Sequence, residues 1–194
     1  QTKFSEGAFA AGKESGLWTS YHPNGQTKEK GAFKAGKMEG EWAGFYDSGK
    51  EKFTSVFKNG ERNGNYKLWY ETGQLQFDKN YKEGKEHGPS IEYHENGKVK
   101  EKGQNSNGYK NGLWEFFYDT GKPFQRIGYN KGRQEGAFDG WYETGVKWYN
   151  STYLNGQLNG ISTNFDEGGK LVFKAKYKKG RLVKVMHQAE CTGK

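Results

Sequence analysis

The sequence predicts an all-β protein, an elongated single-layer antiparallel β-meander made of tandem 24-residue repeats of two strands each. Three observations support this prediction. Glycines recur every 24 residues, aromatic residues recur with the same step, and turn signals separate short segments rich in aromatic and β-branched residues.

Glycine forms three columns, each with a step of 24 residues and no insertion or deletion. The first column is Gly12, Gly36, Gly60, Gly84, Gly108, Gly132, Gly156 and Gly180. The second is Gly16, Gly40, Gly64, Gly88, Gly112, Gly136 and Gly160. The third is Gly25, Gly49, Gly73, Gly97, Gly121, Gly145 and Gly169. A register kept along the whole chain is the signature of a repeat protein.

Aromatic residues follow the same register. Three residues before the first glycine stand Phe9, Phe33, Phe57, Tyr81, Asn105, Tyr129, Tyr153 and Tyr177, a column broken only at Asn105. Five residues after the second glycine stand Tyr21, Phe45, Trp69, Tyr93, Phe117, Trp141 and Phe165, without a break. We expect the polar stretch 104–107 around Asn105 to be a locally loosened part of the fold.

The glycines mark turns, because glycine supplies the positive φ that tight turns need. Pairs such as Asn24-Gly25 and Asn59-Gly60 are hairpin signals, and segments of about six to eight residues lie between them. The expected organisation is a partial repeat at 1–8, seven repeats at 9–176, a partial capping repeat at 177–185 and a flexible tail at 186–194.

Composition favours a thin, aromatic-stabilised chain. Only 31% of residues are hydrophobic, 28% are charged and the mean hydropathy is -1.15, but 16% are aromatic and 30 are glycine. Regularly spaced aromatic residues can replace an aliphatic core because each buries a large area. The single cysteine, Cys191, allows no intramolecular disulfide and no thiolate metal site. The net charge of +8 favours an acidic partner or an anionic surface.

The repeat unit is similar to the MORN-repeat variant of bacterial proteins. Residues 16–25 (GLWTSYHPNG) and 112–121 (GLWEFFYDTG) carry the resemblance most clearly, and it extends over residues 3–185. The arrangement looks like the YwqK family, whose members are described as antitoxins of toxin–antitoxin systems. The resemblance implies an open, twisted sheet used as a scaffold, with a toxin as partner. Related eukaryotic MORN proteins are linked to membranes and phospholipids, which implies anionic lipid as an alternative ligand.

Strand alternation places two sets of side chains on opposite faces of the predicted sheet. The unbroken column from Tyr21 to Phe165 lies on one face. The other carries the Trp18 column, interrupted by Ser90 and Ser162, and the residues four positions further on. Both sets could simply hold a single-layer sheet together, but a column that varies between repeats is typical of a binding surface. The predicted partner-binding residues are Trp18, Trp42, Tyr46, Tyr66, Tyr70, Trp114, Tyr118, Phe138 and Tyr142.

Most lysines are interpreted as a solvated face that prevents edge-to-edge aggregation. They include Lys28, Lys30, Lys50, Lys52, Lys98, Lys100 and Lys102. Lysines interleaved with aromatic residues can also bind single-stranded nucleic acid, but no recognised nucleic-acid module accompanies them, so the sequence does not favour such a partner.

The sequence does not favour catalysis, a metal or a cofactor. His22 and His94 share a column but are three repeats apart, roughly 29 Å at the usual strand spacing, so they cannot share a metal or a proton. The repeated glycines form no phosphate loop because no helix is expected after them.

The sequence therefore predicts a non-catalytic scaffold that binds a partner protein, with an antitoxin or immunity-type role as the first hypothesis. A membrane-associated scaffold that binds anionic phospholipids is the second, and a purely structural or surface protein is the third. A start at Gln1 rather than at methionine is compatible with removal of an export signal, which slightly favours the cell envelope, periplasm or secretion over the cytoplasm.

Overall fold

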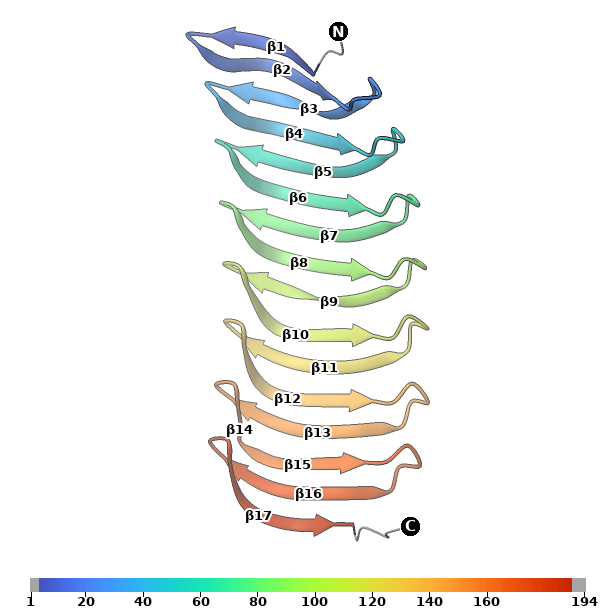
Figure 1. The fold of residues 1–194 in the computed structure, drawn as a ribbon. Helices are drawn as coiled ribbons and strands as arrows, with labels where there is room; N and C mark the ends of the chain where they lie inside the picture. The colour runs from blue at the N-terminus through green and yellow to red at the C-terminus, as the bar shows by residue number, and fades with distance from the viewer. Residues whose placement is uncertain (1–3, 190–194) are drawn as a thin grey trace. The chain divides into compact units, whose positions relative to one another are not determined.

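The computed structural model describes residues 4–189, which form strands and turns and no helix (Figure 1). The chain divides into two compact units, Gln1–Gly97 and Lys98–Lys194. Each unit is a single layer of antiparallel strands joined in chain order, as predicted. No helix with the length and apolar character of a membrane span occurs in this part of the chain.

The first unit contains eight strands, each paired with the next along the chain. They are β1 (Ser5–Ala10), β2 (Lys13–Tyr21), β3 (Thr27–Lys34), β4 (Lys37–Phe45), β5 (Glu51–Lys58), β6 (Glu61–Trp69), β7 (Leu75–Lys82) and β8 (Lys85–Tyr93). From β2 onward, strands of nine and eight residues alternate.

The second unit contains β9 to β17, again paired in chain order. Its strands are β9 (Val99–Ser106), β10 (Tyr109–Phe117), β11 (Pro123–Asn130), β12 (Arg133–Trp141), β13 (Lys147–Leu154), β14 (Gln157–Leu158), β15 (Gly160–Phe165), β16 (Leu171–Lys178) and β17 (Arg181–Gln188). Together β14 and β15 take the place of one long strand, and both pair with β13.

The first glycine column forms two-residue hairpin turns. In the first of them Ala11 has a φ of 48° and Gly12 a φ of 73°, and the same pair of positive values recurs in every repeat. Two consecutive positive φ angles define a type I′ turn, whose twist matches that of the flanking strands. The third column closes the wider turns, where for example the Gly25 amide donates to the His22 carbonyl at 2.9 Å.

The second glycine column does not form turns, so this part of the sequence prediction was wrong. Gly16 lies inside β2 with a φ of 74°. The pairs Gly7↔Trp18 and Ala8↔Ser15 enclose Gly16 and Leu17 on β2 and no residue on β1. The column therefore marks a β-bulge in each long strand, where a positive φ re-aims the chain without ending it.

The tight turns of successive repeats are hydrogen-bonded to one another. The Gly60 amide donates to the Met38 carbonyl at 2.9 Å, and equivalent bonds of 2.8–2.9 Å join the other repeats within each unit. The side chain of Glu39 adds a bond by accepting from the Asn59 amide at 2.8 Å. The tight-turn ends of the strands are therefore held together by backbone hydrogen bonds that do not depend on side-chain identity.

Two local expectations differ from the structure. The stretch around Asn105 is not loosened: it belongs to β9, and Asn105 is 6% exposed. The strand β17 continues to Gln188, three residues into the segment expected as a tail, and residues 190–194 lie outside the described part. All of β17 is exposed, including Val183 at 57%.

Candidate binding surface

The tryptophans of the interrupted column pack across the sheet onto glycines of the preceding strand. A Cβ built on Gly31 would lie 2.2 Å from the Trp42 ring, and one on Gly103 would lie 2.4 Å from the Trp114 ring. The rings can therefore lie flat on the backbone only because these glycines have no side chain. We call the face that carries these rings the tryptophan face.

The column that begins at Phe9 interlocks with the tryptophans on this face. Phe33 makes edge-on contacts with Trp18 at 5.8 Å and with Trp42 at 5.0 Å between ring centroids. The series continues from Trp42 to Phe57 at 6.3 Å. Edge-to-face geometry at these distances is favourable, so the rings replace the aliphatic core that the composition lacks.

The spacing of these pairs is a signal that the sequence analysis missed. Each tryptophan of the column follows a strand glycine by eleven residues, as in Gly7–Trp18, Gly31–Trp42 and Gly103–Trp114. Where the earlier position is not glycine, the later one is not tryptophan, as in Ser55–Tyr66, Lys79–Ser90, Ile127–Phe138 and Ser151–Ser162. The breaks in the column therefore follow the steric fit between neighbouring strands.

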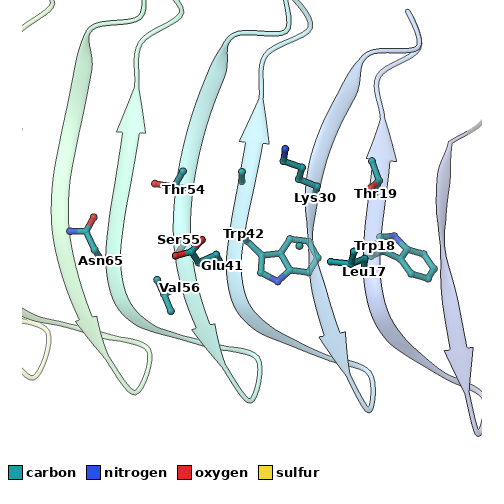
Figure 2. A pocket seen from close by; sticks show the side chains of 12 residues that line it. Leu17, Trp18, Thr19, Lys30, Glu41, Trp42, Thr54, Ser55, Val56 and Asn65 are labelled. Carbon is teal, nitrogen blue, oxygen red and sulfur yellow. The ribbon is translucent and has the colours of Figure 1, made fainter.

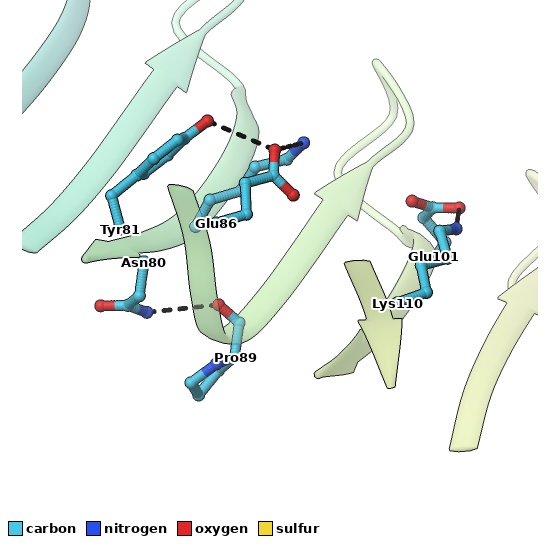
Figure 3. A network of polar contacts seen from close by, with 7 residues as sticks. Asn80, Tyr81, Glu86, Pro89, Glu101 and Lys110 are labelled. Carbon is cyan, nitrogen blue, oxygen red and sulfur yellow. Dashed lines mark hydrogen bonds and ion pairs between the residues drawn. The ribbon is translucent and has the colours of Figure 1, made fainter. Parts of the chain in front are cut away.

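At the Ser90 break a charged cluster replaces the ring. Lys79 pairs directly with Ser90 across the strands, and its Nζ lies 3.0 Å from Glu86 Oε1. The Tyr81 hydroxyl donates to the same carboxylate at 3.3 Å (Figure 3). Burial, together with the Glu86 charge, raises the pKa of Tyr81 to about 12. The nearby Arg62 guanidinium lies over the Tyr66 ring at 4.7 Å, so the cations here are held by aromatic faces as well as by carboxylate.

The tyrosines four positions after the tryptophan column connect one repeat to the next. The Tyr46 hydroxyl donates to the Trp69 carbonyl at 2.6 Å, and the Tyr118 hydroxyl donates to the Trp141 carbonyl at 2.8 Å. Tyr70 and Tyr142 make the same bond at 3.2 and 3.0 Å. His22 takes the equivalent place, with Nε2 at 2.9 Å from the Phe45 carbonyl oxygen. These hydrogen bonds hold the wider turns of successive repeats together.

The nine predicted partner-binding residues therefore all have contacts within the chain, and binding by them stays a prediction. Trp42 is 3% and Trp114 1% exposed, so neither ring offers surface to a partner as it stands. Phe138 contacts the ring of Tyr149 at 5.0 Å. The half-buried members keep accessible surface: Trp18, Tyr46, Tyr66, Tyr70, Tyr118, Phe138 and Tyr142.

Several lysines have structural partners, which the interpretation as a solvated face did not foresee. Lys50 Nζ donates to the Glu71 carbonyl at 2.9 Å, and Lys98 Nζ to the Thr120 carbonyl at 2.8 Å. Lys30 lies over the Phe45 ring, 5.3 Å from its centroid. Lys30 neighbours Gly31, so alternation puts this contact on the face away from the tryptophans, which we call the opposite face.

A hollow of roughly 550 Å³ lies in the first unit across β2 to β6 (Figure 2). It is lined by Leu17, Trp18, Thr19, Lys30, Gly31, Glu41, Trp42, Ala43, Thr54, Ser55, Val56 and Asn65. Alternation assigns Leu17, Thr19, Ala43 and Val56 to the opposite face, where small side chains leave space. Leu17 is 83% exposed, the largest exposure among the large apolar side chains described.

A polar network occupies the opposite face of the second unit. Asp139, which is 7% exposed, accepts hydrogen bonds from Lys147 Nζ and Asn150 Nδ2, both at 2.8 Å. Burial alone would raise the pKa of Asp139, but these hydrogen bonds and the Lys147 charge outweigh it and lower the pKa below 3.8. Asp139 is therefore a paired structural carboxylate.

The titratable side chains do not gather into a metal centre in the part of the chain that the structure describes, where no three His, Cys, Asp or Glu side chains cluster. His187 Nε2 lies 3.1 Å from the Leu171 carbonyl oxygen, a structural contact like that of His22. What these side chains can offer another molecule is a contoured surface with hydrogen-bonding groups.

These features define the class: a tandem β-repeat scaffold in which side chains hold successive two-strand units together. The family model of the MORN repeat variant matches residues 14–35, 62–83, 86–105, 110–131 and 158–179, more than half of the chain. The chain therefore belongs to the MORN repeat variant family. No curated protein matches it.

Proposed function

We propose that this chain is a non-catalytic scaffold that binds a partner protein at the hollow of the first unit. The observation that carries the proposal is the exposed Leu17 beside this hollow. Leu17 lines a hollow of roughly 550 Å³ and is 83% exposed, so it offers an apolar contact that the fold itself does not use. A partner could insert an apolar side chain there and cover Leu17.

Charges around the hollow would orient such a partner. Lys30 and Glu41 stand among the apolar lining residues, and Asn65 is tied to Asp78 Oδ1 by a hydrogen bond of 2.7 Å. Polar groups at the rim of an apolar patch are the usual arrangement in protein interfaces. Of the predicted partner-binding residues, Trp18 and Trp42 line this hollow, whereas the half-buried Tyr46, Tyr66 and Tyr70 belong to the tryptophan face and lie outside the proposed interface.

The role we propose for this binding is that of an antitoxin or immunity-type protein, which neutralises a toxin by direct contact. Membership of the MORN repeat variant family and the YwqK-like arrangement of the repeats support this role. A rigid sheet is suited to it, because little conformational freedom is lost on binding.

Co-purification of the chain with the product of a neighbouring gene, followed by rescue from that product's toxicity, tests the proposal. Leu17→Glu is expected to weaken the complex at least tenfold, since interface anchors cost more than about 1 kcal/mol when removed. Leu113→Glu is the matched control because Leu113 holds the same repeat position in the second unit and is 52% exposed. A complex that tolerates Leu17→Glu, or the absence of any complex and rescue, would refute the proposal.

The alternative is a scaffold that binds anionic phospholipids. It is favoured by the net charge of +8 and by exposed lysines along the tight-turn edge of the first unit, such as Lys34, Lys58 and Lys82. It requires sedimentation with phosphatidylserine vesicles that weakens as salt rises, because the attraction is electrostatic. Equal binding to neutral vesicles would exclude it.

A further inference from the structure

A polar hollow lies at the tight turns of the second unit. Some of the side chains that line it differ from those at the equivalent positions of the other tight turns. The hollow has a volume of roughly 710 Å³ and is lined by residues of three successive turns, among them Tyr109, Asn107, Asn130 and Asn155. We propose that this hollow binds an oligosaccharide that carries carboxylate groups, such as a uronic acid oligomer.

Tyr109 supplies a rigid aromatic platform. Its ring lies against the next tight turn, where a Cβ on Gly132 would be 3.1 Å from Tyr109 Cδ1. That turn is held in place because the Gly132 amide donates to the Lys110 carbonyl at 2.9 Å. Tyr109 is nevertheless 58% exposed, so one side of the ring is supported and much of the rest is open. The apolar face of a sugar ring can stack on such a surface.

Amide side chains surround this ring. Asn107 and Asn155 occupy positive-φ positions of their turns, with φ values of 53° and 52°, and Asn130 ends β11. In the described part of the second unit, none of these three amide groups has a hydrogen-bond partner within the chain. An asparagine amide both donates and accepts, which suits neighbouring sugar hydroxyls that also do both.

At two of these positions the tight turns elsewhere carry different side chains. The residue equivalent to Tyr109 is lysine at Lys13, Lys37 and Lys85, and no other repeat has an aromatic residue there. The position of Asn130 is lysine at Lys34 and Lys58. The backbone is the same in all these turns, so the turns differ in their side chains. At these two positions several other turns carry lysine, whereas this hollow has an aromatic ring and an amide group.

Lys131 and Arg133 make the hollow suitable for an acidic sugar. Both are exposed, and neither forms an ion pair with a residue of the described second unit. One partly compensating charge is Glu135, whose carboxylate accepts a hydrogen bond from the backbone N–H of Asn155 at 2.7 Å. The net local charge is therefore small and positive, which fits scattered carboxylates better than the dense phosphates of a nucleic acid. A single stacking ring also favours a saccharide, since strand-binding surfaces stack successive bases on several rings.

The test is a titration of the full chain with a hexamer of galacturonic acid. Binding is measured by calorimetry and by the NMR shifts of the Gly132 and Gly156 backbone amides. Tyr109→Ala is expected to weaken binding at least tenfold, as loss of an aromatic anchor usually does. Tyr109→Phe keeps the ring and should bind within about threefold of the original chain. Leu113→Ala, which removes another exposed side chain of β10, should leave affinity unchanged.

Three controls define the ligand class. A neutral maltose-type hexamer should bind at least tenfold more weakly than the uronate, and so should a single-stranded RNA hexamer. Tighter binding of the RNA would assign the hollow to nucleic acid and overturn the proposal. It also fails if the neutral sugar binds as well as the uronate, if the uronate does not bind at millimolar concentration, or if Tyr109→Ala has no effect.

Discussion

The side chain of Trp114 shows how one sheet layer can bury an aromatic ring. The ring lies on the backbone of Gly103, its Nε1 donates to the Gln104 carbonyl at 3.0 Å, and the ammonium of Lys110 lies 3.8 Å from the ring centroid. Backbone below, a cation above and a hydrogen bond at the edge leave 1% of the residue exposed. The packing of an aromatic ring on a glycine of the adjacent strand therefore stabilises this protein.

We expect Gly31→Ala to destabilise the fold by about 1–3 kcal/mol, because the new methyl group would force the Trp42 ring away from the backbone. The measurement is the free energy of unfolding from urea titration. Ser55→Ala is the control from the same column: its buried hydroxyl has no hydrogen-bond partner, so the change should be neutral or slightly stabilising.

The combination of Gly31→Ala with Trp42→Ala makes the prediction sharper. Once the ring is gone, the methyl group meets no obstacle, so the double variant should be less destabilised than the sum of the two single variants. Additive effects would show that the glycine and the tryptophan do not interact as described.

Asp139 makes stability depend on pH in the acid range. Its folded-state pKa is lowered below 3.8, so its stabilising contribution is complete above that value and is lost as pH falls through the folded pKa. Asp139→Asn should therefore lower the free energy of unfolding at pH 7, and the difference from the original chain should shrink at pH 2.5. Asp47→Asn, at an exposed turn position, is the control and should change the free energy of unfolding at pH 7 by less than about 0.5 kcal/mol.

At the scale of the strand and turn, each repeat is held to its neighbours at both ends. Tight turns are joined by backbone bonds such as Gly84 amide to Arg62 carbonyl at 2.9 Å. Wider turns are joined by side chains, among them Tyr46 and Lys122, whose Nζ donates to the Glu143 carbonyl at 2.9 Å. The wider turns are consequently the end that depends on sequence, and we expect mutations there to loosen the strand ends first.

Tyr118→Phe removes one such fastening while keeping the ring. The bond from its hydroxyl to the Trp141 carbonyl is 2.8 Å long, so its loss should cost about 0.5–1.5 kcal/mol in the free energy of unfolding. Hydrogen exchange at the following wide turn should rise as well. Tyr109→Phe, at an exposed tyrosine, should change stability by less than about 0.5 kcal/mol, and equal effects of the two variants would contradict the assigned role.

Prediction from sequence worked best at this scale where the signal is local. Asn59-Gly60 requires two positive φ angles, and the structure has them, because few residue pairs tolerate a type I′ turn. The Gly16 column carries the same signal but lies in a bulge, since a positive φ says nothing about whether the chain reverses. Asn105 was misread for a related reason: a polar residue was taken for a loose segment, although β9 buries it.

At the scale of the whole chain, a uniform 24-residue register allows whole repeats to be exchanged or removed. Deletion of residues 37–60 joins Gly36 to Glu61 and leaves strand order and glycine columns intact. We expect this variant to fold cooperatively with a lower stability and a smaller urea m-value, because stability in repeat proteins is roughly a sum over neighbouring units.

Deletion of only residues 37–48 is the contrasting variant. It removes β4 but not β5, so the alternation of long and short strands is lost and Gly31 no longer faces a ring. Circular dichroism and urea titration should show loss of the cooperative transition. Retention of a cooperative fold in this variant, or its loss on removal of residues 37–60, would contradict a description based on whole repeats.

The sequence by itself determined the repeat, its two-strand unit, the antiparallel order and the tight turns, because glycine spacing and backbone φ preferences act over a few residues. Tertiary structure decided what the aromatic columns do. Whether Trp42 is an exposed anchor or a buried ring depends on Gly31 of the adjacent strand, and whether Tyr46 is free depends on the Trp69 carbonyl of the next repeat. Such contacts join positions 11 to 23 residues apart, so they follow from strand register, not from local pattern.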